Sequence, residues 1–217
     1  MPFSSPTTTS SRLLMILTAI TAWVALALQL YILINNTPAN GMTPLQAVGR
    51  FFIFFTILSN LLVAISLTIV LCSPASVAGR FFARPSNIAA VTLYIFIVGL
   101  VYNLVLRSQW KPTGLQKIAD ELLHVAVPLL FTIYWLFIAP KVRLQWKNVF
   151  AWLVFPFAYL VYAMVRGAVE GFYPYPFIDL KTLSIREVVL NCLLVMLAFI
   201  SFGLLLIAIS RIVKKSS

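Results

Sequence analysis

Six long runs of apolar residues, separated by short polar connections, dominate the chain. Each run can cross the hydrocarbon core of a membrane as a helix, which takes roughly 20 residues. None of them alternates apolar and polar positions over the roughly ten residues that a strand of a transmembrane barrel needs, so the pattern favours helices. The predicted spans are 13–34, 51–72, 87–106, 120–139, 148–166 and 187–210.

Composition agrees with this pattern. Of the 217 residues, 62% are hydrophobic and 10% are charged, and the mean hydropathy is +1.01, far from the balance of a soluble domain. The sequence therefore predicts an all-α, polytopic membrane protein, a bundle of six transmembrane helices. Because the connections are short, residues 12–217 are expected to form one domain.

The N-terminal segment 1–11 is rich in serine and threonine and is expected to be a flexible tail. A secretory signal peptide is the alternative. It is disfavoured because the apolar run 13–34 is longer than the roughly 7–15 apolar residues of a signal peptide and ends without a small-residue cleavage site.

Charge is distributed unevenly between the two sides of the membrane. With six spans, the termini share one side with the even-numbered connections, and that side has no acidic residue. It carries Arg12, Arg80, Arg84, Lys141, Arg143, Lys147, Arg211, Lys214 and Lys215. The other side, called outer below, holds seven basic residues and every carboxylate: Asp120, Glu121, Glu170, Asp179 and Glu187. The positive-inside rule then predicts cytoplasmic termini and a basic face toward anionic lipid headgroups. Nucleic acid is not an expected partner of this face.

The two cysteines, Cys72 and Cys192, fall at opposite ends of the membrane in this topology, so no disulfide is expected between them. With one histidine and no cluster of cysteines and histidines, a zinc site is not expected either. No metal or organic cofactor is predicted.

The single histidine, His124, lies within the fourth apolar run. An ionisable group at membrane depth is costly and indicates function, and imidazole is the side chain suited to acid–base chemistry near neutral pH. Counted from the outer ends of their spans at 1.5 Å per residue, Thr56 lies about 9 Å and His124 about 6 Å deep. A hydroxyl nucleophile and its base could therefore meet in one layer.

Further polar side chains share this outer layer and are candidates to bind a substrate or a developing oxyanion. They are Ser59, Asn60, Tyr102, Asn103, Tyr159, Tyr162, Arg166 and, in the proline-rich outer segment 173–179, Asp179. Asp120 and Glu121 precede His124 by four and three residues and could orient its ring. The favoured interpretation of these two carboxylates is a solvated helix terminus.

Structural roles compete with each of these assignments. A threonine in a membrane helix usually donates to the carbonyl four residues earlier, and Ser59 and Asn60 could simply hold helices together. The tyrosines could form an interfacial belt, and Arg166 could reach the headgroups. Pro128 could free the carbonyl of His124 and kink the helix.

Several short motifs together resemble the androgen-induced membrane hydrolases and related bacterial six-span proteins. They are Phe55-Thr56-Ile57-Leu58-Ser59-Asn60, then His124 followed by Val127-Pro128-Leu129, the segment from Trp152 to Pro156 with Tyr159, Tyr162 and Arg166-Gly167, and the loop from Tyr173 to Asp179. They cover the second to the fifth span and the following loop, about two-thirds of the chain.

The resemblance implies an intramembrane threonine hydrolase in which Thr56 corresponds to the nucleophile and His124 to the base. It implies fatty acid esters of hydroxy fatty acids as substrates, and a bacterial inner membrane as the location. The Ser59-Asn60 pair and the Tyr-Pro-Tyr-Pro-Phe loop are typical of the bacterial branch, so the ester cleaved could differ from that of the animal enzymes.

Two other functions compete with hydrolysis. A small transporter or channel would need a polar path through the inner half of the membrane, where spans 2 to 5 have no charged residue. A scaffold or lipid-binding protein would use the same polar residues for packing, and its His124 would tolerate glutamine. Polarity confined to one leaflet favours a pocket.

Overall fold

Six helices are long and apolar enough to cross a membrane in the computed structural model, which describes residues 9–37 and 41–215. Inside a membrane the backbone groups must be satisfied within the chain, which a helix does and an isolated strand does not. The described residues are all-α, and the protein is an integral multi-pass membrane protein. The spans are Thr9–Asn35, Phe55–Cys72, Pro85–Leu106, Gly114–Phe137, Asn148–Glu170 and Ile185–Val213.

Four of these spans are single α-helices: α1 (Thr9–Asn35), α3 (Phe55–Cys72), α8 (Asn148–Glu170) and α9 (Ile185–Lys215). The other two contain π-helical turns. The third span is α5 (Pro85–Val101) followed by η2 (Tyr102–Leu106), and the fourth is α6 (Gly114–Glu121), η3 (Leu122–Ala126) and α7 (Val127–Phe137). A π-helical turn is rare and frequently marks a functional site.

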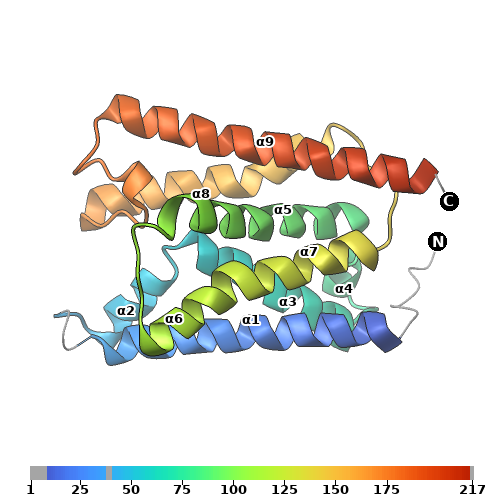
Figure 1. The fold of residues 1–217 in the computed structure, drawn as a ribbon, viewed down its shortest axis with the longest axis horizontal. Coiled ribbons are helices and arrows are strands. Elements are labelled where there is room, and N and C mark those ends of the chain that lie inside the picture. The colour runs from blue at the N-terminus through green and yellow to red at the C-terminus, as the bar shows by residue number, and fades with distance from the viewer. Residues whose placement is uncertain (1–8, 38–40, 216–217) are drawn as a thin grey trace.

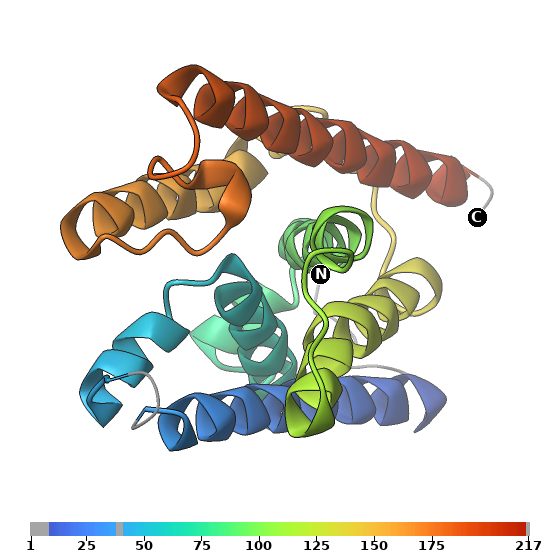
Figure 2. The ribbon, with the colours of Figure 1, turned by 60° about the vertical axis from the view of Figure 1, so that its left-hand side comes forward.

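Helix α5 is the centre of the bundle. It packs against α3 and α7 on one side and against α8 and α9 on the other, while α1 covers α3 and α7. Figure 1 shows α8 and α9 as a pair at one edge and α1 at the opposite edge. The turned view in Figure 2 keeps this order, with α5 between the two groups. The start of α1 and the end of α9 lie at the same end of the bundle (Figure 1).

Short helices occupy two of the connections between the spans. On the outer side, α2 (Pro44–Phe51) begins with a reciprocal capping box between Thr43 and Gln46. On the side of the termini, α4 (Val77–Phe82) is capped by Ser76, whose hydroxyl accepts the amide of Gly79 at 2.9 Å. The outer segment between α8 and α9 contains one 3-10 turn, η4 (Pro176–Ile178), and is otherwise irregular, as its prolines predicted.

Several predicted boundaries need correction. The second span begins at Phe55, not at 51, because α2 ends at Phe51 and the backbone is extended at Phe54. The fourth begins six residues before its predicted start, at Gly114 rather than 120. Helix α1 begins at Thr9, so residues 9–11 of the predicted tail are helical, and residues 1–8 lie outside the described residues.

Candidate active site

The hydroxyl of Thr56 meets the imidazole of His124. Thr56 Oγ1 lies 3.4 Å from His124 Nε2, and only 8% of Thr56 is exposed. The expectation that these two residues come together is therefore met. The depths counted from sequence were wrong in detail, because Thr56 lies in the first turn of α3 and the fourth span begins earlier than predicted.

Thr56 differs from the other threonines whose bonds in the spans are resolved. Thr18, Thr21, Thr68 and Thr92 each donate to the carbonyl four residues earlier on their own helix, at 2.7, 2.8, 2.7 and 2.8 Å. That bond is the usual structural role of a threonine in a membrane helix. In the first turn of α3, Thr56 has no helical carbonyl four residues before it, and its hydroxyl turns to side chains instead.

The backbone fixes which nitrogen of His124 carries a proton. His124 Nδ1 lies 2.9 Å from the carbonyl oxygen of Asp120. A carbonyl can only accept, so Nδ1 is the donor and, in the neutral ring, Nε2 is the acceptor. Nε2 therefore presents its lone pair to the hydroxyl of Thr56. The ring is also stacked on Tyr102, with centroids 3.9 Å apart and planes inclined by 15°.

Both π-helical turns are used at this point, since Tyr102 begins η2 and His124 lies in η3. In η3 the amide of Val127 bonds to the carbonyl of Leu122, five residues earlier. The next residue, Pro128, has no amide proton, so the carbonyl of His124 lacks its helical donor. Asn103 Nδ2 supplies a donor from 3.3 Å. The proposal that Pro128 frees this carbonyl is consistent with that contact.

Close approach of the third and fourth spans depends on Gly99. A Cβ atom at this glycine would lie 3.0 Å from Cβ of Pro128 and 3.2 Å from the carbonyl oxygen of His124. Both distances are shorter than ordinary van der Waals contacts, so any larger residue must push the segment carrying His124 away from α5. Gly99 thus lets η3 lie against α5.

Asn60 joins the second span to the fourth. Its Nδ2 donates to the carbonyl of Thr56 at 2.8 Å and to the carbonyl of Leu123 at 3.2 Å. Asn60 is fully buried and does not line the pocket described below. The geometry therefore does not support an oxyanion role for Asn60. It does not support one for Asn103 either, because this amide donates to the carbonyls of Gly99 and His124. Both amides hold the backbone that carries the catalytic candidates.

Three candidates on α8, Tyr159, Tyr162 and Arg166, form a ladder along one side of the helix that also contacts backbone. Tyr159 donates to the carbonyl of Ile53 at 2.9 Å, and Tyr162 to that of Phe52 at 3.5 Å. One turn further, Arg166 lies 3.5 Å from the carbonyl of Gly49 and 3.0 Å from the hydroxyl of Tyr162. Arg166 also forms an ion pair with Glu170 at 2.5 Å. These contacts hold the break between α2 and α3, immediately before Thr56, and of the three ladder residues only Tyr159 lines the pocket.

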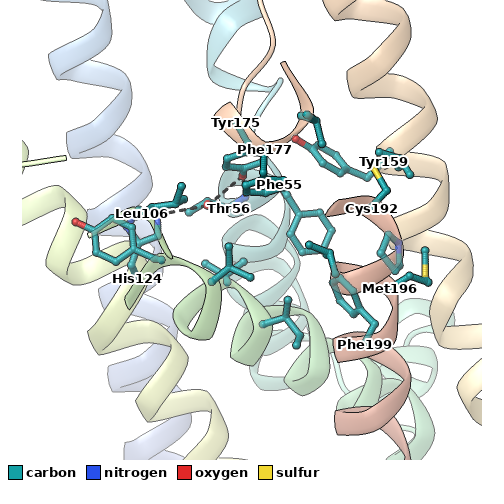
Figure 3. A pocket seen from close by; sticks show the side chains of 18 residues that line it. Phe55, Thr56, Leu106, His124, Tyr159, Tyr175, Phe177, Cys192, Met196 and Phe199 are labelled. Atoms are coloured by element: carbon teal, nitrogen blue, oxygen red, sulfur yellow. Dashed lines mark hydrogen bonds between the residues drawn. The ribbon is translucent and has the colours of Figure 1, made fainter. Parts of the chain in front are cut away.

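Tyr175 is a site residue that the sequence prediction did not single out. Its hydroxyl lies 3.4 Å from Thr56 Oγ1 and accepts the backbone amide of Thr56 at 3.3 Å. Figure 3 shows Thr56 between His124 on one side and Tyr175 on the other. Because the single proton of the Thr56 hydroxyl is directed to Nε2, the Tyr175 hydroxyl is the donor in its contact with Oγ1. Burial raises the pKa of Tyr175, which keeps this hydroxyl protonated and able to donate.

Asp120 contradicts the interpretation of a solvated helix terminus. It is 5% exposed, and its carboxylate accepts from Trp110 Nε1 at 2.7 Å, Tyr102 at 3.1 Å and Gln116 at 3.4 Å. Glu121 does lie at the surface, where it pairs with Arg107 at 2.9 Å. The position of Asp120 four residues before His124 was the sequence signal that it could act on the ring. Its burial could not be predicted, because it depends on Tyr102 and Trp110, which lie on other segments.

The pair opens into a pocket with a volume of about 80 Å³. Its polar end is formed by Thr56, His124, Tyr102, Tyr159 and Tyr175. The rest of the lining is apolar and comes mainly from α5, α8 and α9: Ile97, Val98, Val101, Leu106, Pro156, Leu160, Cys192, Val195, Met196 and Phe199, with Phe55, Phe177 and Ile178. Figure 3 shows Cys192, Met196 and Phe199 following one another along α9. The last span, which carried no motif in the sequence, thus forms one wall.

Two further candidates lie away from the pocket. Ser59 is fully buried, is not among the residues that line the pocket, and its hydroxyl has no hydrogen-bond partner among the described residues. Asp179 accepts the amide of Lys181 at 2.9 Å and organises the turn that leads to α9. The cysteines are free, as predicted, with Cys72 exposed at the end of α3 and Cys192 in the pocket wall.

Comparison with family models, with curated proteins and with solved structures finds no match to this chain. The geometry of the site therefore carries the functional assignment.

Proposed function

We propose that this protein is an intramembrane threonine hydrolase that cleaves lipid esters, with Thr56 as nucleophile and His124 as general base. The observation that carries the proposal is the directed contact between the Thr56 hydroxyl and the unprotonated Nε2 of His124, 3.4 Å apart at the polar end of an apolar pocket. Without substrate, such catalytic contacts are often longer than the 2.6–3.2 Å expected during the reaction.

The reaction proceeds in two halves. Nε2 takes the proton of the Thr56 hydroxyl as Oγ1 attacks the ester carbonyl carbon, and the tetrahedral intermediate collapses when the imidazolium gives that proton to the leaving alcohol. The acyl group is then bound to Thr56 as an ester. Water, deprotonated by the same Nε2, attacks this ester, releases the fatty acid and restores the threonine.

The oxyanion of each tetrahedral intermediate needs donors close to Oγ1. The Tyr175 hydroxyl is suitably near at 3.4 Å, and it remains protonated. Thr56 also lies in the first turn of α3, where the helix dipole favours negative charge. Tyr175 is therefore the donor assigned to the oxyanion, in place of Asn60 and Asn103.

The substrate class follows from the lining. A long acyl chain gains about 0.8 kcal/mol for each methylene group that it buries, and the walls from α5, α8 and α9 are apolar. Fatty acid esters of hydroxy fatty acids, the substrates implied by the resemblance to the androgen-induced membrane hydrolases, fit this requirement. Arg166 is committed to Glu170, so it is not assigned to a substrate carboxylate.

The proposal includes an orientation. The site lies toward the end of the bundle that carries the carboxylates, and the opposite end, where α1 begins and α9 ends, is the side without acidic residues. The positive-inside rule then puts the termini in the cytoplasm and the site in the outer leaflet of a bacterial inner membrane. A membrane-impermeant maleimide should label the exposed Cys72 in inverted vesicles and spare it in spheroplasts.

Labelling with a lipid-like fluorophosphonate tests the chemistry. The purified protein in detergent should form a mass adduct that maps to Thr56 and disappears in Thr56→Ala and His124→Ala. Thr21→Ala is the matched control, because its hydroxyl bonds only to the carbonyl of Leu17 on its own helix. Thermal unfolding confirms that each variant is folded. A native protein that forms no adduct, or a His124→Gln variant labelled at the native rate, would contradict the proposal.

A further inference from the structure

The carboxylate of Asp120 is held by neutral groups. Trp110 and Tyr102 donate to Oδ2 at 2.7 and 3.1 Å, and Gln116 lies 3.4 Å from Oδ1. All three donors are uncharged, so none of them supplies a cation to the carboxylate. A carboxylate buried at the outer end of the fourth span is costly and indicates a function.

No lysine or arginine within the described residues forms an ion pair with this carboxylate. Arg107 is paired instead with Glu121, at 2.9 Å. The basic group that does face Asp120 is His124, whose Nδ1 lies 3.9 Å from Oδ1. The positive charge that would complete this pair appears only when the imidazole is protonated.

We infer that Asp120 is a positioning residue of the proposed hydrolase, which stabilises the imidazolium formed when His124 accepts the Thr56 proton. This inference rests on the proposed function. The carbonyl of Asp120 fixes the tautomer through Nδ1, and its carboxylate supplies the opposite charge. One residue thus acts on His124 twice, and Tyr102 connects both actions because it binds the carboxylate and stacks on the ring.

The other groups around His124 do not supply this charge. Tyr102 stacks on the ring and Thr56 contacts Nε2, and both are uncharged hydroxyl side chains. Arg107 and Glu121 lie toward the surface and offset each other. Of the charged groups that face the ring, Asp120 is the one that is buried and without a cation.

The chain has one histidine, so NMR of protein with isotopically labelled histidine observes His124 without assignment. Asp120→Asn keeps the size and the backbone carbonyl but removes the charge. The imidazolium then loses its partner, and half-protonation of the ring should move to lower pH by about one unit, a tenfold change in proton binding. Glu121→Gln is the matched control, because it removes a carboxylate one residue away that is already paired with Arg107, and its shift should be much smaller.

The labelling rate supplies the second readout. Fluorophosphonate labelling of Thr56 should fall on the order of 100-fold in Asp120→Asn and stay near native in Glu121→Gln. Asp120→Glu, which retains the charge, should recover part of the loss and reports on Asp120 even if the asparagine variant does not fold. Equal titration shifts in Asp120→Asn and Glu121→Gln, or native labelling in Asp120→Asn, would overturn the inference. Absence of labelling in the native protein would instead overturn the proposed function.

Discussion

The side-chain amide of Asn60 donates a hydrogen bond to the carbonyl of Leu123, 3.2 Å away, and so ties the helix that carries Thr56 to the π-helical turn that carries His124. The same amide binds the carbonyl of Thr56 at 2.8 Å. One buried side chain therefore sets the distance between the two proposed catalytic residues.

Asn60→Ala should weaken both stability and labelling. The buried carbonyl of Leu123 loses this donor, which costs about 1–3 kcal/mol, and the helices carrying Thr56 and His124 are no longer tied. The apparent melting temperature in detergent and the rate of fluorophosphonate labelling should both fall. Labelling at the native rate by a destabilised variant would show that Asn60 holds the fold without setting the site.

Tyr175→Phe should slow labelling, with a modest loss of stability because the Thr56 amide loses its acceptor. The ring stays in place, but the hydroxyl 3.4 Å from Thr56 Oγ1 is lost. Removal of one oxyanion donor typically slows such reactions about 100- to 1,000-fold. Tyr162→Phe is the control, since that hydroxyl binds backbone outside the pocket. Equal labelling rates in the two variants would exclude an oxyanion role for Tyr175.

Gly99→Ala should impair the site, whereas Gly49→Ala should not. A methyl group at Gly99 presses on Pro128 and on the carbonyl of His124, at 3.0 and 3.2 Å. At Gly49 the nearest atom to a methyl group is 3.7 Å away, and alanine is the better helix former. We expect slower labelling and a lower melting temperature for the first variant and an unchanged or higher melting temperature for the second. Native behaviour of Gly99→Ala would mean that the spans can separate without cost.

Attachment of a long alkyl chain to Cys192 through a mixed disulfide should block the acyl site. Cys192 lines the pocket on α9, whereas Cys72 is exposed at the opposite end of the bundle. A long-chain alkyl thiosulfonate should abolish labelling of Thr56 in Cys72→Ser and leave it intact in Cys192→Ser. Prior occupation by a fatty acid should slow the reaction at Cys192. If modification of Cys192 left Thr56 labelling unchanged, the acyl chain could not bind along the α9 side of the pocket.

Much of this structure could be predicted from hydropathy and residue type. The six spans were predictable because a run of about 20 apolar residues has few stable alternatives to a transmembrane helix. The pairing of Thr56 with His124 was predictable as well, since the chain offers one imidazole and the polar residues collect in one leaflet. The loss of the helical donor to the carbonyl of His124 was also predictable from Pro128, because a missing amide proton is a local property of the sequence.

Only the tertiary structure decided what each neighbouring polar group does. Residues 51–54 read as apolar span, yet the helix breaks there because side chains on α8 bind the exposed carbonyls. Asn60, Asn103 and the α8 ladder looked like substrate ligands but satisfy backbone groups. Asp120 looked like a solvated terminus until Trp110 and Tyr102 enclosed it. Periodicity gives the face and depth of a side chain, whereas its hydrogen-bond partners depend on which helices pack together, and that packing is not local.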